Sequence, residues 1–325
     1  MRAVRYHDHG DADVLQVDEV DRPTPDRDEV LVEIRAASVN RVDVLFRSGR
    51  YGDLPLPTIP GGDGAGVVAA VGEDVAAFAV GDRVVASGMD RAAGGTFAEY
   101  ATIPAAKLAR LPEDLSWTAG GAIGNVGATA WTALEGLAGV QAGDRVLVHG
   151  GSGGVGHAAV QIAAHSGAQV ITTAGTETAR RRLEALGASV ALDYESDSLA
   201  EDILAATDGA GVETILDHRL EEYLDLDLEV VTAGGQIIST MGQIPATNAR
   251  PFYDTEVTVQ PLKMDNRPVR RPTLERLVRL IEQDALTPVV ADTYALEDAT
   301  QAQQDLLAGG SLGKRVVTPS QDSER

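Results

Sequence analysis

The chain has 325 residues, of which 44% are hydrophobic, and its 49 acidic and 27 basic residues give a formal net charge of −22. This length and composition exclude a disordered chain and predict a globular protein of two domains. The acidic charge disfavours nucleic acid and anionic membranes as partners. The absence of cysteine excludes disulfides, cysteine-ligated zinc and thiol catalysis.

The first residues, MRAVRYHDHG, have no apolar core of the signal-peptide kind, and no run of about 18 apolar residues could span a membrane. We therefore expect a cytoplasmic protein. Only three of the basic residues are lysines: Lys107, Lys263 and Lys314. An acidic, lysine-poor composition favours a halophilic protein, because concentrated salt screens the repulsion between like charges. An acidic enzyme from an ordinary environment is the alternative.

The first third of the chain consists of short candidate strands separated by turns. They lie at 29–39, 64–75, 80–87 and 95–104, where β-branched runs are interrupted by glycine and acidic residues. This cluster predicts a small, irregular, mostly antiparallel barrel.

The apolar spacing becomes helical at 116–137, and strand and helix patterns then alternate between residues 145 and 242. Such alternation is typical of a doubly wound parallel sheet of the Rossmann type, so the expected fold class is α/β. An amphipathic helix is predicted at 271–286, and a last strand is predicted within 309–319.

A glycine-rich segment, GSGGVG at 151–156, lies between the first strand of that region and the helix after it. This context predicts a dinucleotide site, because glycines let the backbone turn tightly near a pyrophosphate while helix amides point at the anion. A strand-to-helix turn without a ligand is the alternative. The residues expected to contact the cofactor are Ser152, Gly153, Gly154 and Val155.

The end of the second strand of this unit lacks the acidic residue that usually binds the ribose of NAD. Residues 172–175 are Thr-Thr-Ala-Gly, and three arginines follow at 180–182. Guanidinium groups suit phosphate oxygens, so the pattern favours NADPH over NADH, with a solvated basic helix face as the alternative. The expected contacts at the adenosine end are Thr173, Gly175, Thr176, Arg180 and Arg181.

With the barrel pattern and the closing SLGKRVV, these motifs resemble the medium-chain dehydrogenase/reductase superfamily, and more narrowly its zinc-independent quinone oxidoreductase branch. The similarity runs nearly end to end. It implies a GroES-like catalytic domain at 1–122, completed by 266–325, a Rossmann NADP-binding domain at 123–265, and a homodimer. The most telling segments are 36–51 (AASVNRVDVLFRSGRY), 59–72 (IPGGDGAGVVAAVG), 80–85 (VGDRVV), 146–156 (VLVHGGSGGVG) and 187–194 (GASVALDY).

The resemblance also bears on metal binding. In the zinc alcohol dehydrogenases of this superfamily a cysteine ligand stands where this chain has Asn40, and a histidine before a glutamate stands where it has Gly62 and Asp63. The resemblance therefore implies no bound metal and an acceptor with its own electron sink, a quinone or a conjugated carbonyl. The alternatives are an enone or enoyl-thioester reductase of the 2-alkenal or acryloyl-CoA type, and an NADPH-binding protein without turnover.

By the same resemblance Asn40 is expected near the nicotinamide and the substrate oxygen, and Thr129 beside the nicotinamide. Tyr51 is expected to line the pocket, where it would donate a hydrogen bond or relay a proton. The alternatives are a turn residue for Asn40 and a side chain packed between domains for Tyr51.

Further expectations concern the rest of the cofactor site. Tyr194 is expected near the adenosine phosphate and Gly242 beside the nicotinamide, while Asp43 and His149 are expected to be structural. Residues 217–222 are DHRLEE where the family has Asp-Ser-Val-Gly-Gly, which leaves the shape of that edge of the pocket open.

Overall fold

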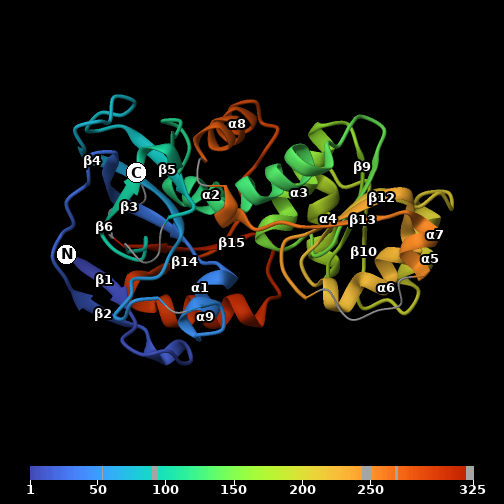
Figure 1. The fold of residues 1–325 in the computed structure, drawn as a ribbon, viewed down its shortest axis with the longest axis horizontal. Coiled ribbons are helices and arrows are strands. Elements are labelled where there is room, and N and C mark those ends of the chain that lie inside the picture. Colours follow the sequence, from blue (N-terminus) through green and yellow to red (C-terminus); the bar gives the residue numbers. More distant parts are fainter. Residues whose placement is uncertain (53, 90–93, 244–249, 268–269, 320–325) are drawn as a thin grey trace.

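The computed structural model of the protein describes residues 1–52, 54–89, 94–243, 250–267 and 270–319. Figure 1 shows two lobes side by side, with helices α2 (Trp117–Trp131) and α3 (Gly154–His165) where they meet. The red C-terminal strands lie among the blue N-terminal elements, so both ends of the chain belong to the first lobe.

The first lobe is built on a seven-stranded sheet of order β14-β15-β3-β4-β5-β7, with β6 paired to β3. Its pairs are antiparallel except β14 with β15, which agrees with the predicted barrel-like domain. Strands β1 and β2 form a separate antiparallel pair. The bounds are β1 (Arg2–Arg5), β2 (Gln16–Glu19), β3 (Glu29–Ser38), β4 (Asp63–Val71), β5 (Arg83–Ser87), β6 (Tyr100–Pro104), β7 (Leu108–Arg110), β14 (Val290–Ala295) and β15 (Lys314–Thr318).

The helices of this lobe include the predicted amphipathic one, α8, whose Leu274 and Leu277 are buried as their spacing requires. Short helical turns connect several strands. The bounds are α1 (Arg41–Arg47), α8 (Arg271–Glu282), α9 (Ala299–Ala308), η1 (Ala12–Val14), η2 (Ala105–Lys107), η4 (Met264–Asn266) and η5 (Leu296–Asp298).

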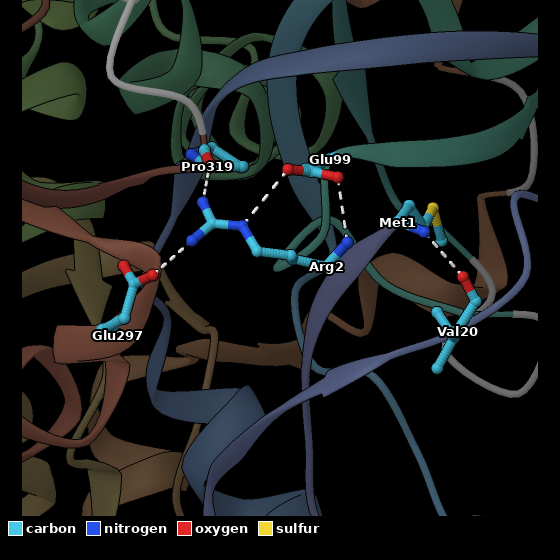
Figure 2. A network of polar contacts seen from close by, with 6 residues as sticks. All are labelled: Met1, Arg2, Val20, Glu99, Glu297 and Pro319. Carbon is cyan, nitrogen blue, oxygen red and sulfur yellow. Dashed lines mark hydrogen bonds and ion pairs between the residues drawn. The ribbon is translucent and has the colours of Figure 1, made fainter.

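A cluster of polar contacts fastens the N-terminus to the C-terminal strands (Figure 2). The backbone amide of Arg2 lies 2.9 Å from the carboxylate of Glu99, and its guanidinium donates to Glu99, Glu297 and the Pro319 carbonyl. The N-terminal ammonium donates to the Val20 carbonyl at 2.7 Å. These contacts hold β1, the segment before β6 and the end of β15 together.

The second lobe is a six-stranded parallel sheet of order β10-β9-β8-β11-β12-β13. The chain order reverses between β8 and β11, and parallel sheets of this kind bind their ligands outside the strand ends at that point. The bounds are β8 (Arg145–Val148), β9 (Gln169–Thr173), β10 (Val190–Leu192), β11 (Val212–Asp217), β12 (Val231–Ser239), β13 (Thr258–Pro261), α4 (Glu177–Ala185), α5 (Leu199–Ala206), α6 (Leu220–Val230) and α7 (Arg250–Thr255).

Helix α2, which continues as the π-helical segment η3 (Thr132–Ala138), joins the two lobes. Its glycines let it lie directly on the first sheet: a Cβ atom on Gly124 would come within 2.3 Å of the Ala86 carbonyl oxygen. One buried apolar cluster therefore runs from Ala36 in the first sheet through Ile123 in α2 to Val146 in the second sheet.

The α/β fold class is confirmed, but helices α1, α6, α7 and α9 were not anticipated from the sequence. Helix α1 has only seven residues and lies inside the 36–51 segment, where no helix was predicted. Helix α6 buries Leu220, Leu224 and Leu228 at helical spacing, a pattern hidden among its acidic residues. The domain boundaries at 122/123 and 265/266 stay predictions.

Candidate functional site

The glycine loop lies at the predicted place, between the end of β8 and the start of α3, next to the reversal of strand order. Its backbone is fastened to the end of β9: the Gly151 amide donates to the Thr173 carbonyl at 2.8 Å, and the Gly150 amide donates to the Thr173 hydroxyl at 3.0 Å. Thr173 is fully buried, so it shapes the loop from beneath.

The loop has the form that a dinucleotide pyrophosphate requires. A Cβ atom on Gly156 would lie 2.3 Å from the Gly150 carbonyl oxygen, so only glycine lets the helix start this close to the loop. Helix α3 begins at Gly154, and its first amides have no acceptor within the helix. Val155 is partly buried against the core. Amides and the positive end of the helix dipole at this position fit an anion.

At the adenosine end, the two predicted arginines behave differently. The Arg180 guanidinium turns back to the end of β9, where Nη1 donates to the Ala174 carbonyl at 3.0 Å and lies 2.8 Å from the Asp193 carboxylate. Arg181 instead pairs with Glu177 along the helix, and its side chain is 71% exposed. Thr176 begins α4, with its hydroxyl accepting from the Ala179 amide at 3.2 Å. Of these two arginines, Arg180 lies against the end of β9 and Arg181 lies in solvent.

Two further residues complete this end of the site. Tyr194 covers Gly175, because a Cβ atom there would lie 2.4 Å from the tyrosine hydroxyl. The second is Asp193, which was not predicted: it directly follows the neighbouring strand β10 rather than β9 and pairs with Arg180. Its position beside Tyr194 in the GASVALDY motif was the available signal.

On the other side of α3, a buried polar network contains Asn40, Asp43, Asp63, Asn125 and Lys314. Asn40, just before α1, is 6% exposed. Its Nδ2 donates to Asp63 Oδ1 at 2.7 Å and to the Ser38 carbonyl at 3.3 Å, while its Oδ1 accepts from Lys314 Nζ at 2.8 Å. The network thus fixes the side-chain amide of Asn40 at both of its ends.

Burial shifts the pKa values of two charged groups in this network, Asp63 and Lys314. Burial raises the pKa of Asp63 to about 6, against the opposing effect of the Lys314 ammonium, and Asp63 Oδ2 accepts from the Asn125 amide at 2.8 Å. Burial lowers the pKa of Lys314 below its usual range, while Asp63 and Asp43 counteract this. Asp43 also accepts a hydrogen bond from the Asn40 backbone amide at 3.1 Å, which fits its expected structural role.

Thr129 and Tyr51 lie on different sides of this network. Thr129 is one turn after Asn125 in α2, and its hydroxyl donates to the Asn125 carbonyl at 2.7 Å. The ring of Tyr51 is 40% exposed and contacts Phe46 edge-on, with 5.1 Å between ring centroids. The Nζ atom of Lys263, which follows β13 of the second lobe, lies 5.4 Å from the Tyr51 ring centroid. Tyr51 therefore stands between the two lobes with part of its surface open.

The edge formed by residues 217–222 is less charged than its sequence suggests. Leu220 is buried and Arg219 pairs with Glu222 on the exposed side of α6. His218 lies over the glycine loop, because a Cβ atom on Gly150 (φ +59°) would come within 2.5 Å of its imidazole. Burial lowers the pKa of His218 to about 4, so this side chain is neutral near pH 7.

Behind this edge, His149 is structural, as expected. Its Nε2 lies 2.8 Å from the Asp227 carboxylate, both side chains are fully buried, and the imidazole stacks on Tyr223 with centroids 4.3 Å apart. Gly242 follows β12 with a φ of +103°, and a Cβ atom there would lie 2.2 Å from the Glu221 carboxylate. The position therefore needs glycine, whichever ligand it faces.

Two features are absent from the described part of the chain, a membrane-spanning helix and a cluster of metal ligands. None of its helices combines the length and apolarity needed to cross a membrane. These same residues contain no group of three or more histidine, cysteine, aspartate or glutamate side chains that could hold a metal ion.

Known proteins share both this architecture and this sequence. The alcohol dehydrogenase GroES-like domain family matches residues 26–113, and the zinc-binding dehydrogenase family matches residues 154–283, which makes the chain an oxidoreductase of the medium-chain dehydrogenase/reductase class. The quinone oxidoreductase of Lama guanicoe is 35% identical over 323 residues, 98% of this chain and 97% of that protein. The chain belongs to the quinone oxidoreductase family, as its sequence motifs predicted.

Solved structures agree on the fold and differ in the cofactor they name. Escherichia coli quinone oxidoreductase complexed with NADPH superposes with a TM-score of 0.91 at 26% identity, covering 98% of this chain and all of that one. An NAD-dependent alcohol dehydrogenase superposes with a TM-score of 0.91 at 32% identity and the same coverage. The cofactor preference of this chain must therefore be argued from its own residues.

Proposed function

We propose that this protein is an NADPH-dependent, zinc-independent oxidoreductase that reduces a quinone or a conjugated carbonyl compound. The observation that carries the proposal is the direct contact between the glycine loop and the buried polar network. A Cβ atom on Gly154 would lie 2.6 Å from Lys314 Cδ, so the start of the cofactor helix adjoins the site of Asn40. A cofactor on that loop would have its reactive end beside a fixed, buried hydrogen-bonding centre.

The cofactor preference rests on the adenosine end of the site. No carboxylate ends β9, and Arg180 reaches back to that strand end through its bond to the Ala174 carbonyl. The pairing of Arg180 with Asp193 is partly exposed, so a 2′-phosphate could replace the carboxylate as the partner of the guanidinium. The amides of Gly154 and Val155, at the start of α3, would hold the pyrophosphate, while the Gly153 amide donates to the Gly150 carbonyl at 2.9 Å. NADPH, when bound, supplies the hydride.

The roles at the acceptor follow from exposure and hydrogen bonding. Tyr51 has an exposed side chain between the lobes and would donate a hydrogen bond to the acceptor oxygen or relay a proton to it. One amide hydrogen of Asn40 is bound closely by Asp63 and the other only loosely by the Ser38 carbonyl, so the second could be shared with the acceptor oxygen without moving the amide. Thr129 would border the nicotinamide from α2.

Donor chemistry supports the zinc-independent part of the proposal. Zinc in this superfamily is held by thiolate and imidazole ligands, whereas this chain offers the amide of Asn40 and the carboxylate of Asp63. Both groups are already engaged, with each other and with Lys314 and Asn125. If activity were lost to a chelator and regained with zinc, this part of the proposal would be wrong.

An enone or enoyl-thioester reductase is the second candidate, because hydride transfer to a conjugated carbonyl needs the same centre. Lys263, whose ammonium lies 5.4 Å from the Tyr51 ring centroid and 3.7 Å from the Asp265 carboxylate, is a cation beside Tyr51 that would attract an anionic acceptor. The homodimer, the cytoplasmic location and the adaptation to salt stay predictions. Molar mass in solution and stability across salt concentrations test the first and third of them.

The decisive experiment is steady-state NADPH oxidation in concentrated salt with a panel of quinones and a panel of 2-alkenals and enoyl thioesters. We expect turnover with quinones to exceed turnover with the other acceptors. Faster reduction of alkenals or thioesters would favour the second candidate. Tight NADPH binding without turnover of either panel would instead indicate a cofactor-binding protein that does not catalyse.

A further inference from the structure

The lysine that begins β15 joins the two halves of the site. Lys314 is 4% exposed, in a chain that uses arginine for nearly all its basic residues. Its ammonium donates to the Val39 carbonyl and to Asn40 Oδ1, while its aliphatic stem lies against the start of α3 at Gly154. The preceding amide, of Gly313, donates to the Ser152 carbonyl at 2.9 Å. Lys314 thus contacts the acceptor side and the cofactor side at once.

The charges around Lys314 show what its ammonium compensates. Asp63 of β4 and Asp43 of α1 are both buried, and both act on Lys314 electrostatically. Its other ionisable neighbours are the buried His157 of α3 and Arg315, whose guanidinium lies 3.5 Å from Asp292. Burial lowers the pKa of His157 to about 4, so it is neutral near pH 7. Lys314 is therefore the cation that faces the two buried carboxylates.

We propose that Lys314 is a positioning residue for hydride transfer, whose buried ammonium offsets the carboxylates of Asp43 and Asp63 and polarises the Asn40 amide toward the acceptor oxygen. The inference rests on the proposed function and deepens it. In the reduction the acceptor gains a hydride from NADPH and a negative charge on its oxygen, which a proton from water then neutralises, leaving NADP⁺. Two buried carboxylates beside that oxygen would oppose this charge.

The ammonium of Lys314 would act on the acceptor through the side-chain amide of Asn40. A hydrogen bond from an ammonium to an amide oxygen polarises the amide and strengthens its N–H groups as donors. Asn40 Nδ2 has one close acceptor, Asp63 at 2.7 Å, and one distant acceptor, the Ser38 carbonyl at 3.3 Å. The hydrogen directed at Ser38 is the one an acceptor oxygen would attract. A buried ammonium acting through Asn40 would thus stabilise the charge that a Lewis acid stabilises in metal-dependent relatives.

The first test compares Lys314→Met with Lys107→Met, a lysine of η2 outside the site. Methionine keeps the unbranched stem and removes the charge. We expect the single-turnover rate of hydride transfer to fall about 10- to 100-fold in Lys314→Met. The NADPH dissociation constant, measured by nucleotide fluorescence without acceptor, should change less than about twofold, because the ammonium bonds to Val39 and Asn40. Lys107→Met should match the wild type in both.

The second test measures the effect of the Lys314 charge on Asp63 without any turnover, from the pH dependence of the free energy of unfolding. The folded-state pKa of Asp63 lies above its unfolded value, so its contribution to stability is present at low pH and is lost as pH rises through about 6. Removing the Lys314 ammonium should raise that pKa further and move the loss to higher pH. It should also bring the His157 pKa closer to its usual value, which reduces the loss of stability at low pH. Both changes make the variant more stable at low pH relative to high pH.

Asp63→Asn in both backgrounds isolates the contribution of Asp63, and the double variant Lys314→Met/Asp63→Asn removes both charges. If Lys314→Met does not fold, the double variant measured against Asp63→Asn alone carries the kinetic test, with the same direction expected. An unchanged hydride-transfer rate, or a pH profile of unfolding that does not move, would overturn the proposal. If the wild type reduces no acceptor, the proposed function fails, and the unfolding profiles still decide whether Lys314 compensates Asp63.

Discussion

The two ends of the proposed cofactor site use charge in opposite ways. At the adenosine end, Arg180 and Asp193 form a pair whose side chains are 22% and 39% exposed, and water screens it. At the hydride end, Asp63 and Lys314 are buried and share Asn40 as a common hydrogen-bond partner. An exposed pair can exchange its carboxylate for a phosphate at small cost, so it suits recognition. A buried network resists rearrangement, so it suits the holding of a reactive geometry.

The strongest test of this contrast removes one carboxylate from each end. Asp63→Ala leaves the Lys314 ammonium buried with a weaker set of partners and should lower the free energy of unfolding by about 3–5 kcal/mol. Asp193→Ala removes the partner of a partly exposed guanidinium and should cost only about 0–1 kcal/mol. Denaturant unfolding at pH 8, where Asp63 is ionised, measures both. Equal losses at the two ends would mean that the burial contrast has no energetic consequence.

The next test asks whether the exposed end selects the cofactor. Arg180→Ala should weaken NADPH binding about 10- to 100-fold, the value of a lost hydrogen bond between charged groups, and should change NADH binding little. Arg181→Ala is the matched control, because that arginine pairs with Glu177 in solvent. Asp193→Asn should tighten NADPH binding by releasing Arg180. Nucleotide titration followed by fluorescence measures all three variants. An equal loss of NADPH and NADH affinity in Arg180→Ala would show that Arg180 does not recognise the phosphate.

The same contrast explains how far the sequence could predict the molecule. The parallel sheet, the glycine loop and α8 follow from local periodicity and glycine spacing, and these predictions hold. The sequence singles out Arg180 because it is close to the loop along the chain, and its contact with the cofactor stays a prediction. Its partner Asp193 belongs to the next strand segment, and nothing local indicates that it reaches back across the sheet edge.

The hydride end was the hardest to predict, because its residues are far apart in sequence. Asn40, Asp63 and Lys314 meet only through the pairing of β3 with β4 and of β15 with β3. The family resemblance singled out Asn40, but no local pattern shows that a lysine 274 positions later binds its side-chain oxygen. Helix α6 was missed for a different reason: its buried leucines are outnumbered by polar and acidic neighbours in a short segment.

A smaller effect is expected at Tyr51, which would contact the acceptor. Tyr51 belongs to the same lobe as Asn40 and is 40% exposed. The ammonium of Lys263, in the second lobe, lies beside its ring. Tyr51→Phe should lower the turnover number about fivefold, the value of one hydrogen bond of about 1 kcal/mol, without changing the NADPH dissociation constant. Phe46→Leu, which removes the ring packed against Tyr51, distinguishes lost positioning from the lost hydroxyl. Unchanged turnover in Tyr51→Phe would leave the tyrosine a packing role only.

The smallest expected effect is that of salt, which should weaken the contribution of Arg180 and leave that of Lys314 unchanged. Between about 0.1 M and about 1 M salt the screening length falls from about 10 Å to about 3 Å, which weakens exposed charge pairs and hardly affects buried ones. The preference for NADPH over NADH should therefore decrease about threefold over this range, as the exposed Arg180 loses part of its attraction for phosphate. The loss of hydride-transfer rate in Lys314→Met should be the same at both salt concentrations, because its partners Val39 and Asn40 are buried. Measuring both quantities in one salt series makes the protein its own control. The opposite result would be a rate loss in Lys314→Met that decreases with salt and a cofactor preference that does not. It would contradict both assignments, cofactor recognition by the partly exposed Arg180 and fixed charge at the buried Lys314.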